Sequence, residues 1–535
     1  MGRTVTWLAG MAHLLVTVGW LGMWLYASLW AGEPAPSTPT TSQTDKSWWQ
    51  QLDESDLRRH VSVLAADALE GREAGQRGGQ AAAAYLVQQF RQLGLAPAGD
   101  GMDYRQAFQG RYQNVLGLIR GQDADLQREW IVLGAHYDHV GYGRPENSFG
   151  PWGQIHNGAD DNASGVALLL EVAQAWQQRP QSPRRTLMFA AWDAEELGLL
   201  GSRHWIQQHA ASSRQRIVLA LNFDMVGRLR HDRVNVMGWR TAVGLRTLVS
   251  AANQERLRFQ FASEITADSD HYPFYELRYP FIHVDTFRHE DYHRPSDDAD
   301  KLNYTGMLRL GRVVLHLLDQ LDQQPQLPTF RQELLREANW IAPDPTRRIP
   351  APIRLGVSWD LEQTDRARIV YVAPRSPADQ VGLRPGDVLL RFGSWQAGSL
   401  ASLQNTIVSA PRRVFVEWQR PGEPEPRQAT IILWGDAVRS GLHGVQDPAV
   451  SEGILVTQIV RSSPAEAAGI LPGDYLLRWR DQPVRSIEQL TNLIKQDVGP
   501  IPLTLEREGI RYVAKLTLPS AENTDEMHPQ PEPKP

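Results

Sequence analysis

The chain of 535 residues contains no cysteine. This absence excludes disulfide bonds, thiolate metal sites, a cysteine nucleophile and the lipid-bearing cysteine of a lipoprotein anchor. A surplus of positive charge is also missing, because 61 acidic residues against 55 Lys and Arg give a formal net charge of −6. The sequence shows no basic stripe either, and we therefore expect no nucleic-acid partner.

Asp, Glu, Lys and Arg are absent from residues 4–32. As a helix, residues 5–30 would span about 39 Å, which exceeds the hydrocarbon core of a bilayer, about 30 Å. We expect residues 1–32 to be an uncleaved N-terminal signal anchor, with a cleaved signal peptide or a buried core helix as the alternatives. Arg3 and the α-amino group favour a cytoplasmic N-terminus. The rest of the chain would then be exported, periplasmic or otherwise extracytoplasmic, and anchored in the inner membrane by residues 5–30.

The remaining sequence divides into segments of different composition. Residues 33–50 are rich in Pro, Ser and Thr and predict a flexible linker. Residues 51–325 alternate strand-like and helical patterns, which predicts an α/β domain built on a mostly parallel, doubly wound sheet. Residues 326–350 carry many prolines and predict a second linker, and residues 521–535 predict a disordered tail.

An internal repeat lies between these last two segments. Ser376-Pro377-Ala378 recurs as Ser463-Pro464-Ala465, and Pro385-Gly386-Asp387 recurs at the same offset as Pro472-Gly473-Asp474. The repeat predicts two copies of one small β-rich domain, residues 351–436 and 437–520.

Two adjacent glutamates, Glu195 and Glu196, follow the apolar run 187–191, which is typical of a buried strand. Acidic side chains at the end of a buried strand are costly unless a positive charge meets them. A metal ion is the simplest such charge. One glutamate would bind it, and its neighbour would transfer protons.

Other candidate ligands follow further expected strands. His136 and Asp138 follow strand 130–135 on one side of the chain, so that the carboxylate can orient the imidazole. Asp224 ends strand 217–221. Open α/β sheets bind their ligands at the carboxyl ends of parallel strands, and we expect these side chains to converge there.

Two further stretches are less specific. Asp160 and Asp161 lie in a Gly-bounded loop that opens an expected helix, 164–178, where an aspartate can serve only as a cap. Two aspartates after a His-x-Asp strand favour a metal role for one of them. Among the histidines of the region 271–293, His293 stands out because it lies in the Pro-stiffened loop 292–297.

Together these motifs resemble the bacterial co-catalytic zinc aminopeptidase family, whose relatives include glutamate carboxypeptidases and glutaminyl cyclases. The resemblance covers residues 51–322 and includes Leu69-Glu70-Gly71-Arg72 and Asp300-Lys301-Leu302-Asn303. It implies two Zn²⁺ ions per chain, bridged by Asp161. The other implied ligands are His136 and Asp224 for one ion, and Glu196 and His293 for the other. It also implies Glu195 as general base, Asp138 as the residue that orients His136, and Tyr292 as a donor to the reaction oxyanion.

The two repeats resemble PDZ domains of the bacterial protease type. Their carboxylate-binding loops would include Leu355, Gly356 and Val357 in the first copy and His443, Gly444 and Val445 in the second. Such loops bind protein ligands or C-terminal peptides while the peptide extends the edge of the sheet. The alternative is that one or both copies only pack against the catalytic domain or stabilise it.

The resemblance implies an exported zinc aminopeptidase that removes N-terminal residues from peptides through a metal-bridged hydroxide. A carboxypeptidase or another amide hydrolase of the same fold is an alternative. A glutaminyl cyclase is another, although cyclases of this group use a single metal and the five-ligand set argues against one. A non-catalytic, PDZ-bearing binding protein belongs to a different class, and the complete set of ligands argues against it.

Overall fold

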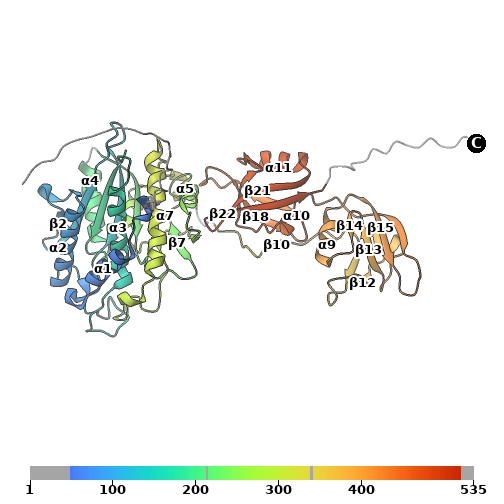
Figure 1. The fold of residues 1–535 in the computed structure, drawn as a ribbon, viewed down its shortest axis with the longest axis horizontal. Coiled ribbons are helices and arrows are strands. Elements are labelled where there is room, and N and C mark those ends of the chain that lie inside the picture. Colours follow the sequence, from blue (N-terminus) through green and yellow to red (C-terminus); the bar gives the residue numbers. More distant parts are fainter. Residues whose placement is uncertain (1–47, 213–214, 338–340, 520–535) are drawn as a thin grey trace, which may run out of the picture. The chain divides into compact units, whose positions relative to one another are not determined.

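The structure is a computed structural model that describes residues 48–212, 215–337 and 341–519. These residues form three separate sheets (Figure 1). The expected anchor, residues 5–30, and the expected tail, residues 521–535, lie outside the described residues. Within the described residues, no helix combines the length and the apolar character that crossing a bilayer requires. The domain boundaries and the membrane anchor stay predictions.

The first sheet is mixed. Its strands lie in the order β1-β3-β5-β4-β6-β9-β7-β8, and β2 pairs with β3. Their bounds are β1 Ala96–Pro97, β2 Arg105–Phe108, β3 Tyr112–Ile119, β4 Glu129–His136, β5 Thr186–Trp192, β6 Arg216–Phe223, β7 Arg233–Met237, β8 Arg258–Phe261 and β9 Phe281–Asp285. The buried apolar runs of β4, β5 and β6 place them at the centre.

The prediction of a mostly parallel sheet is wrong at the edges. The central path β5-β4-β6-β9 is parallel. In contrast, β1, β2 and β5 each pair antiparallel with β3, and β7 pairs antiparallel with β9. The short connection between β2 and β3 permits only an antiparallel pair, since a parallel pair needs a crossover of a dozen or more residues.

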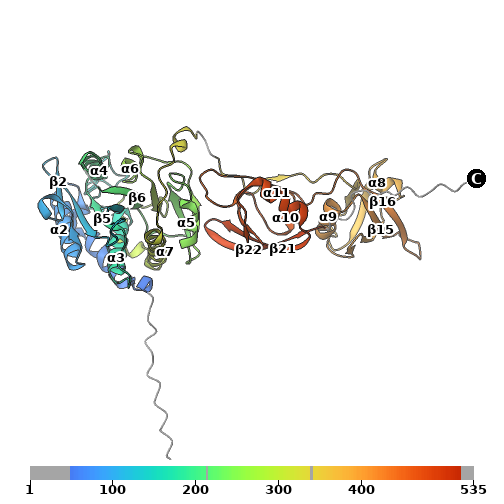
Figure 2. The same cartoon turned by 90° about the horizontal axis from the view of Figure 1, so that it is seen from above.

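Helices cover both faces of this sheet, as a doubly wound fold requires (Figure 2). Their bounds are α1 Glu54–Leu64, α2 Arg77–Gln92, α3 Gly165–Gln177, α4 Leu200–Ser212, α5 Leu245–Ala252, α6 Tyr272–Glu276 and α7 Tyr304–Gln323. Alternate residues of β5 pack against the helices on opposite faces of the sheet. Phe189 packs in the core with α1, α2, α3 and α7, whereas Met188 packs in the core with Trp205 of α4 and Phe274 of α6.

The two repeats form the other two sheets. The first comprises β11 Val357–Trp359, β12 Ala367–Val372, β13 Val388–Phe392, β14 Trp395–Gln396, β15 Arg413–Gln419 and β16 Arg427–Ile432, with α8 Pro377–Gln380 and α9 Leu400–Ser409. The second comprises β10 Arg348–Ile349, β17 Leu442–Val445, β18 Ile454–Val460, β19 Tyr475–Trp479, β20 Gln482–Pro483, β21 Gly499–Arg507 and β22 Ile510–Leu518, with α10 Pro464–Ala467 and α11 Ile487–Gln496. The orders β11-β12-β13-β15-β16 and β17-β18-β19-β21-β22 are equivalent. Strand β10, from the expected linker 326–350, pairs with β18 of the second repeat.

Backbone hydrogen bonds correct the expected equivalence of the two loops. The carbonyl of Gly356 accepts from the N–H of Ala373, and the carbonyl of Gly441 accepts from the N–H of Val460. Both glycines have positive φ, 82° and 74° respectively. Gly441, not Gly444, is therefore the counterpart of Gly356. The residues His443, Gly444 and Val445 lie within strand β17.

Buried ion pairs connect the part of the chain that forms the first sheet with the second repeat. Arg240 Nη1 lies 2.9 Å from Asp447 Oδ2, and Arg246 Nη2 lies 2.9 Å from Glu506 Oε1. Arg246 binds both oxygen atoms of Glu506, and its guanidinium lies 4.3 Å from the centre of the Tyr475 ring. A buried ion pair is tolerated only when geometry this favourable compensates for the lost water.

Candidate metal centre

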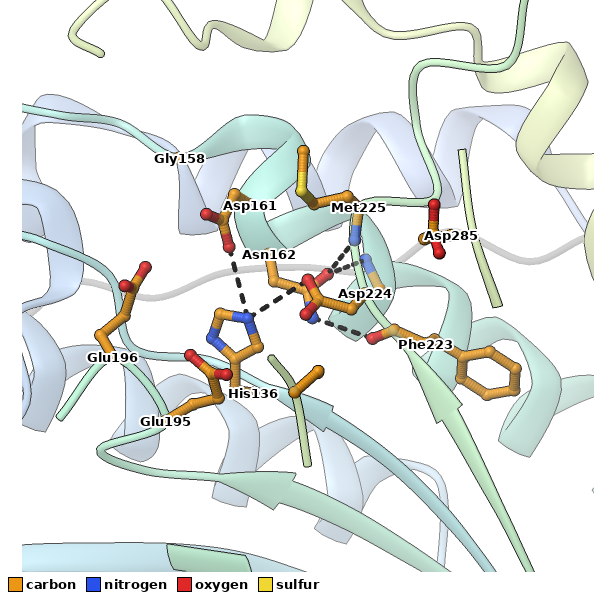
Figure 3. Close-up of polar contacts among 12 residues, drawn as sticks. His136, Gly158, Asp161, Asn162, Glu195, Glu196, Phe223, Asp224, Met225 and Asp285 are labelled. Carbon is orange, nitrogen blue, oxygen red and sulfur yellow. Dashed lines mark hydrogen bonds and ion pairs between the residues drawn. The ribbon is translucent and has the colours of Figure 1, made fainter. Parts of the chain in front are cut away.

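Four of the five predicted metal ligands lie close together where the central strands of the first sheet end: His136, Asp161, Glu196 and Asp224 (Figure 3). His136 is the last residue of β4, Asp224 follows β6, and Glu195 and Glu196 lie just after β5. These strands run parallel, so their carboxyl ends share one edge. Asp161 reaches the same place from the turn η4 (Ala159–Ser164), which precedes α3.

Two groups of ligand atoms share Asp161. His136 Nε2 lies 3.3 Å from Asp161 Oδ1 and 3.3 Å from Asp224 Oδ1. His293 Nε2 lies 3.0 Å from Asp161 Oδ2 and 3.2 Å from Glu196 Oε1. Donor atoms that bind one zinc ion tetrahedrally at 2.0–2.2 Å lie about 3.2–3.6 Å from one another. The five side chains therefore fit a pair of ions bridged by Asp161.

The electrostatics of the cluster favour cations. Burial lowers the pKa of His293, but the carboxylates of Glu196 and Asp161 overcome this effect and raise it to about 11. Burial likewise opposes the charge of His136, while Glu195 and Asp224 raise the pKa of His136 well above its usual range. The carboxylates thus attract positive charge strongly. Divalent ions would replace the protons on these histidines, because a metal ligand must be unprotonated.

Asp161, and not its neighbour Asp160, faces the two histidines. The carboxylate of Asp160 accepts hydrogen bonds from the N–H of Gly227 at 2.6 Å and from His289 Nε2 at 3.1 Å. The backbone N–H groups of Asp160 and Asp161 both donate to Asp297 Oδ2, at 2.9 and 3.0 Å. Asp160 and Asp297 therefore hold the turn that presents Asp161.

Glu195 lines the same cavity as the ligands but belongs to neither ligand group. Burial raises the pKa of Glu195 well above its usual range; His136 lowers it, and the charge of Glu196 raises it further. A carboxylate that binds protons readily and is not occupied by a metal suits general base catalysis.

Asp138 has a different geometry from the one expected. Its Oδ1 lies 3.6 Å from His136 Nδ1, which is too long for a hydrogen bond. The same imidazole nitrogen lies 3.2 Å from the backbone carbonyl oxygen of Asp138. The carboxylate accepts instead from the N–H groups of Glu195 and Glu196, at 3.1 and 3.3 Å. Asp138 thus orients His136 through its backbone and fixes the pair of glutamates through its side chain.

Tyr292 lines the cavity beside the second ligand group. Its ring stacks on that of His293 with the centres 4.0 Å apart, and the guanidinium of Arg288 lies 4.8 Å from the ring centre. Burial raises the pKa of the Tyr292 hydroxyl, as do the charges of Asp161 and Glu196. The hydroxyl therefore stays protonated at neutral pH and can donate a hydrogen bond.

The part of the cavity beyond the ligands combines the apolar side chains Met225, Met237 and Phe287 with polar ones. Its lining includes Asn235, Asp268, His283, Asp285 and Arg288. Asn235 Nδ2 donates to Asp285 Oδ2 at 2.6 Å, and His283 Nε2 lies 3.5 Å from the same oxygen. These side chains can accommodate a charged or polar group of a substrate.

His139 also lies at the centre, although the sequence motifs did not predict it as a site residue. Its Nδ1 lies 2.9 Å from Glu196 Oε1 and 3.8 Å from Asp161 Oδ2. The ligand atoms of His139, Asp161, Glu196 and His293 all lie within 4.8 Å of one another. The available signal was the sequence His136-Tyr137-Asp138-His139, in which a second histidine directly follows the motif residue.

The fold and the centre together define a class: an α/β protein with a carboxylate–histidine centre suited to two divalent ions. Residues 114–318 match the model of Peptidase family M28. The matched segment contains all five predicted ligands and Glu195. The resemblance to zinc aminopeptidases is thus supported for this segment at the level of the peptidase family.

The most similar relatives match only part of the chain. Aminopeptidase YwaD of Bacillus subtilis (strain 168) is 27% identical over 243 residues, which are 43% of this chain and 50% of that protein. A glutamate carboxypeptidase 2 homolog of Caenorhabditis briggsae is 36% identical over 120 residues, 22% of this chain and 13% of that protein. The chain therefore matches half or less of the length of these curated relatives.

Solved structures align with about half of this chain. LapA aminopeptidase of Legionella pneumophila aligns with a TM-score of 0.44 and 18% identity, covering 52% of this chain and 74% of that one. Glutaminyl cyclase of Porphyromonas gingivalis aligns with a TM-score of 0.42 and 20% identity, covering 51% of this chain and 99% of that one.

Proposed function

We propose that the chain is a zinc-dependent aminopeptidase that hydrolyses the N-terminal residue of peptides. One observation carries the proposal: the two oxygen atoms of Asp161 face two separate ligand groups, 3.3 Å from His136 Nε2 and 3.0 Å from His293 Nε2. When bound, a pair of zinc ions lowers the pKa of water and polarises the scissile carbonyl.

The side chains of the cavity supply the rest of the chemistry. Glu195 accepts the proton of the attacking water and later delivers it to the leaving amine, which requires that it not bind metal itself. The hydroxyl of Tyr292 donates a hydrogen bond to the developing oxyanion. Asp138 keeps Glu195 in place, because its carboxylate accepts from the N–H of that residue at 3.1 Å.

The charge of the cavity supports recognition of an N-terminal ammonium. Glu195, Asp268 and Asp285 line it and belong to neither ligand group, so metal ions would not neutralise their charge directly. A free α-ammonium is the substrate group that such a wall stabilises. The partial match to aminopeptidase YwaD points the same way.

A carboxypeptidase is the second candidate. Arg288 lines the cavity and can bind the C-terminal carboxylate of a peptide. The partial match to the glutamate carboxypeptidase 2 homolog also favours this activity. The two candidates differ in which end of the peptide must be free.

The proposal extends to the rest of the chain. Residues 5–30 would anchor it in the inner membrane and place the peptidase outside the cytoplasm. The two repeats would be PDZ domains. Their loops around Gly356 and Gly441 would bind C-terminal peptides or protein ligands beside strands β11 and β17.

A substrate panel tests the activity. We expect aminoacyl anilides and peptides with free N-termini to be hydrolysed, N-blocked peptides to be resistant, and a chelator to abolish turnover until zinc is restored. Release of C-terminal residues from N-blocked peptides would identify the carboxypeptidase instead. Full activity in metal-free protein would exclude both.

A further inference from the structure

His139 is placed at the metal centre without an assigned role. The residue is buried, and Nδ1 points to the second ligand group, 2.9 Å from Glu196 Oε1 and 3.8 Å from Asp161 Oδ2. Its ring meets that of His293 edge to face, with the centres 5.4 Å apart. The nitrogen Nε2 has no hydrogen-bond partner within the described residues.

The surrounding backbone holds this ring in one orientation. The N–H of His139 donates to the carbonyl of Arg72 at 3.2 Å. Gly158 lies against the ring, and a Cβ at that position would lie 2.5 Å from His139 Cδ2. Gly158 also has a φ of 57°, which glycine adopts readily. A larger residue there would displace the imidazole.

We infer that His139 is a sixth metal ligand, and that its Nδ1 binds the ion held by Glu196 and His293. The inference rests on the proposed dinuclear centre. The distances from His139 Nδ1 to Glu196 Oε1 and to Asp161 Oδ2, 2.9 and 3.8 Å, bracket the spacing of about 3.2–3.6 Å between donors on a tetrahedral zinc ion. In the same group, His293 Nε2 lies 3.0 Å from Asp161 Oδ2 and 3.2 Å from Glu196 Oε1, close to this spacing.

A sixth ligand makes the two ions unequal. Asp161, Glu196, His293 and His139 give one ion four protein ligands, the number typical of closed zinc sites. His136, Asp161 and Asp224 give the other ion three, the number typical of sites that keep a position open for water or substrate. The four-ligand ion is then retained more firmly, and the three-ligand ion is lost first on dilution or chelation.

The competing role is that of an orienting neighbour. In that case Nδ1–H would donate a hydrogen bond to Glu196 and touch no metal. Two substitutions separate the roles. Gln can replace a hydrogen-bond donor but is a poor zinc ligand, whereas Asp can bind zinc but cannot donate a hydrogen bond when ionised.

The test measures zinc stoichiometry and affinity in the full chain after dialysis against limiting zinc, together with the visible spectrum of the cobalt-substituted protein. We expect two zinc ions in the wild type and in His139→Asp. We expect His139→Gln to bind the ion held by Glu196 and His293 more weakly and to change the cobalt spectrum. The loss of affinity should exceed about 100-fold, because loss of an orienting neighbour costs only about 10–100-fold. His60→Gln, at a buried histidine that bonds Tyr85 at 2.6 Å, is the matched control and should behave as the wild type.

The opposite pattern would overturn the inference. Retention of both ions by His139→Gln, or loss by His139→Asp alone, assigns an orienting role. A crystal structure of the zinc-loaded wild type provides a test that does not depend on any variant. It should place Nδ1 about 2.0–2.1 Å from the ion, and a separation above about 3 Å contradicts a ligand role. A wild-type chain that binds no zinc at all would instead refute the proposed function.

Discussion

At the scale of single residues, Glu195 and Glu196 are neighbours with different partners. Glu196 Oε1 lies 3.2 Å from His293 Nε2, within a ligand group, whereas Glu195 lines the cavity outside both groups. Asp138 holds the backbone N–H groups of both. In the proposed mechanism, one turn after a buried strand would therefore provide both a metal ligand and a separate proton acceptor.

This division predicts distinct effects of two conservative substitutions. We expect Glu195→Gln to lower kcat by about 10²–10⁴-fold and to leave the zinc content unchanged, because a neutral amide cannot accept the proton of water. Glu196→Gln is the matched control and should lose zinc. Anilide hydrolysis and elemental analysis give the two readouts. Normal turnover by Glu195→Gln would remove that residue from the mechanism.

Glu171 of α3 is a buried carboxylate outside the metal centre, and it makes the free energy of unfolding depend on pH. Burial raises the pKa of Glu171 from 4.5 to about 7. Burial also lowers the pKa of the nearby His60 to about 4, so that this histidine is neutral at the same pH and provides no positive charge. The folded state thus binds a proton that the unfolded state releases at lower pH. This contribution to stability is complete below pH 4.5 and is lost as the pH rises through about 7.

We expect the free energy of unfolding to fall between pH 5 and pH 8 more steeply in the wild type than in Glu171→Gln. The difference should approach about 3 kcal/mol. Urea denaturation across this range, at saturating zinc, measures it. The exposed Glu488 of α11 offers a control, since Glu488→Gln should not alter the slope. Identical slopes for wild type and Glu171→Gln would contradict this account.

At the scale of elements, one arginine connects the segments that carry the centre. The guanidinium of Arg72 is buried and donates to the carbonyls of Tyr137 at 2.8 Å, Asn157 at 2.6 Å and Gly158 at 2.9 Å. Tyr137 directly follows β4, and Asn157 and Gly158 belong to the loop before Asp161. Burial lowers the pKa of Arg72 to about 10, which still leaves it charged at neutral pH.

We expect Arg72→Met to lower the free energy of unfolding by at least about 3 kcal/mol, because it leaves several buried carbonyls without donors. It should also weaken zinc binding, since the loop that carries Asp161 loses its support. Arg77→Met is the control: Arg77 pairs with Glu70 but its side chain is 80% exposed, and the change should stay within about 0.5 kcal/mol. Equal midpoints for the two variants in urea would show that Arg72 does not organise the loop.

At the scale of the whole molecule, the centre concentrates negative charge within the fold. Asp138, Asp161 and Asp224 lie buried within the same region, and Glu195 and Glu196 adjoin them. Without ions, mutual repulsion and lost hydration oppose the folded state. Zinc that binds only the folded state would therefore stabilise the fold that holds the centre.

Removal of zinc with a chelator should therefore lower the Tm by several degrees. At free zinc 1,000-fold above Kd, each ion contributes about 4 kcal/mol. Calorimetry before chelation, after chelation and after zinc is restored measures the effect. Glu195→Gln should respond as the wild type does. A Tm that does not change on chelation and reloading would contradict a structural contribution of the metal.

Several elements were predictable from local sequence alone. The apolar runs 130–135, 187–191 and 217–221 predicted strands that the structure extends to Glu129–His136, Thr186–Trp192 and Arg216–Phe223. Buried central strands are recognisable because both of their faces are apolar. The edge strands were not recognised as such, because their direction depends on connections and partners elsewhere in the chain.

Long-range contacts also explain why the predictions for the repeats were partly wrong and why His139 was not predicted at the centre. The equivalence of Gly356 with Gly441 is visible only in the bonds to Ala373 and Val460. Strand β10 pairs with β18, which is more than a hundred residues away in the sequence. His139 had no recognisable partner until Glu196 was brought to 2.9 Å from its ring.

The sequence by itself determined which kinds of side chain follow the buried strands, and hence that carboxylates and imidazoles would gather at one edge of a sheet. It did so because strand burial and ligand chemistry are local properties. Only the tertiary structure decided that Asp161 faces His136 with one oxygen and His293 with the other, and that the Asp138 carboxylate binds the glutamates rather than His136. These pairings join residues from separate elements, and their distances follow from how the sheet and its loops pack.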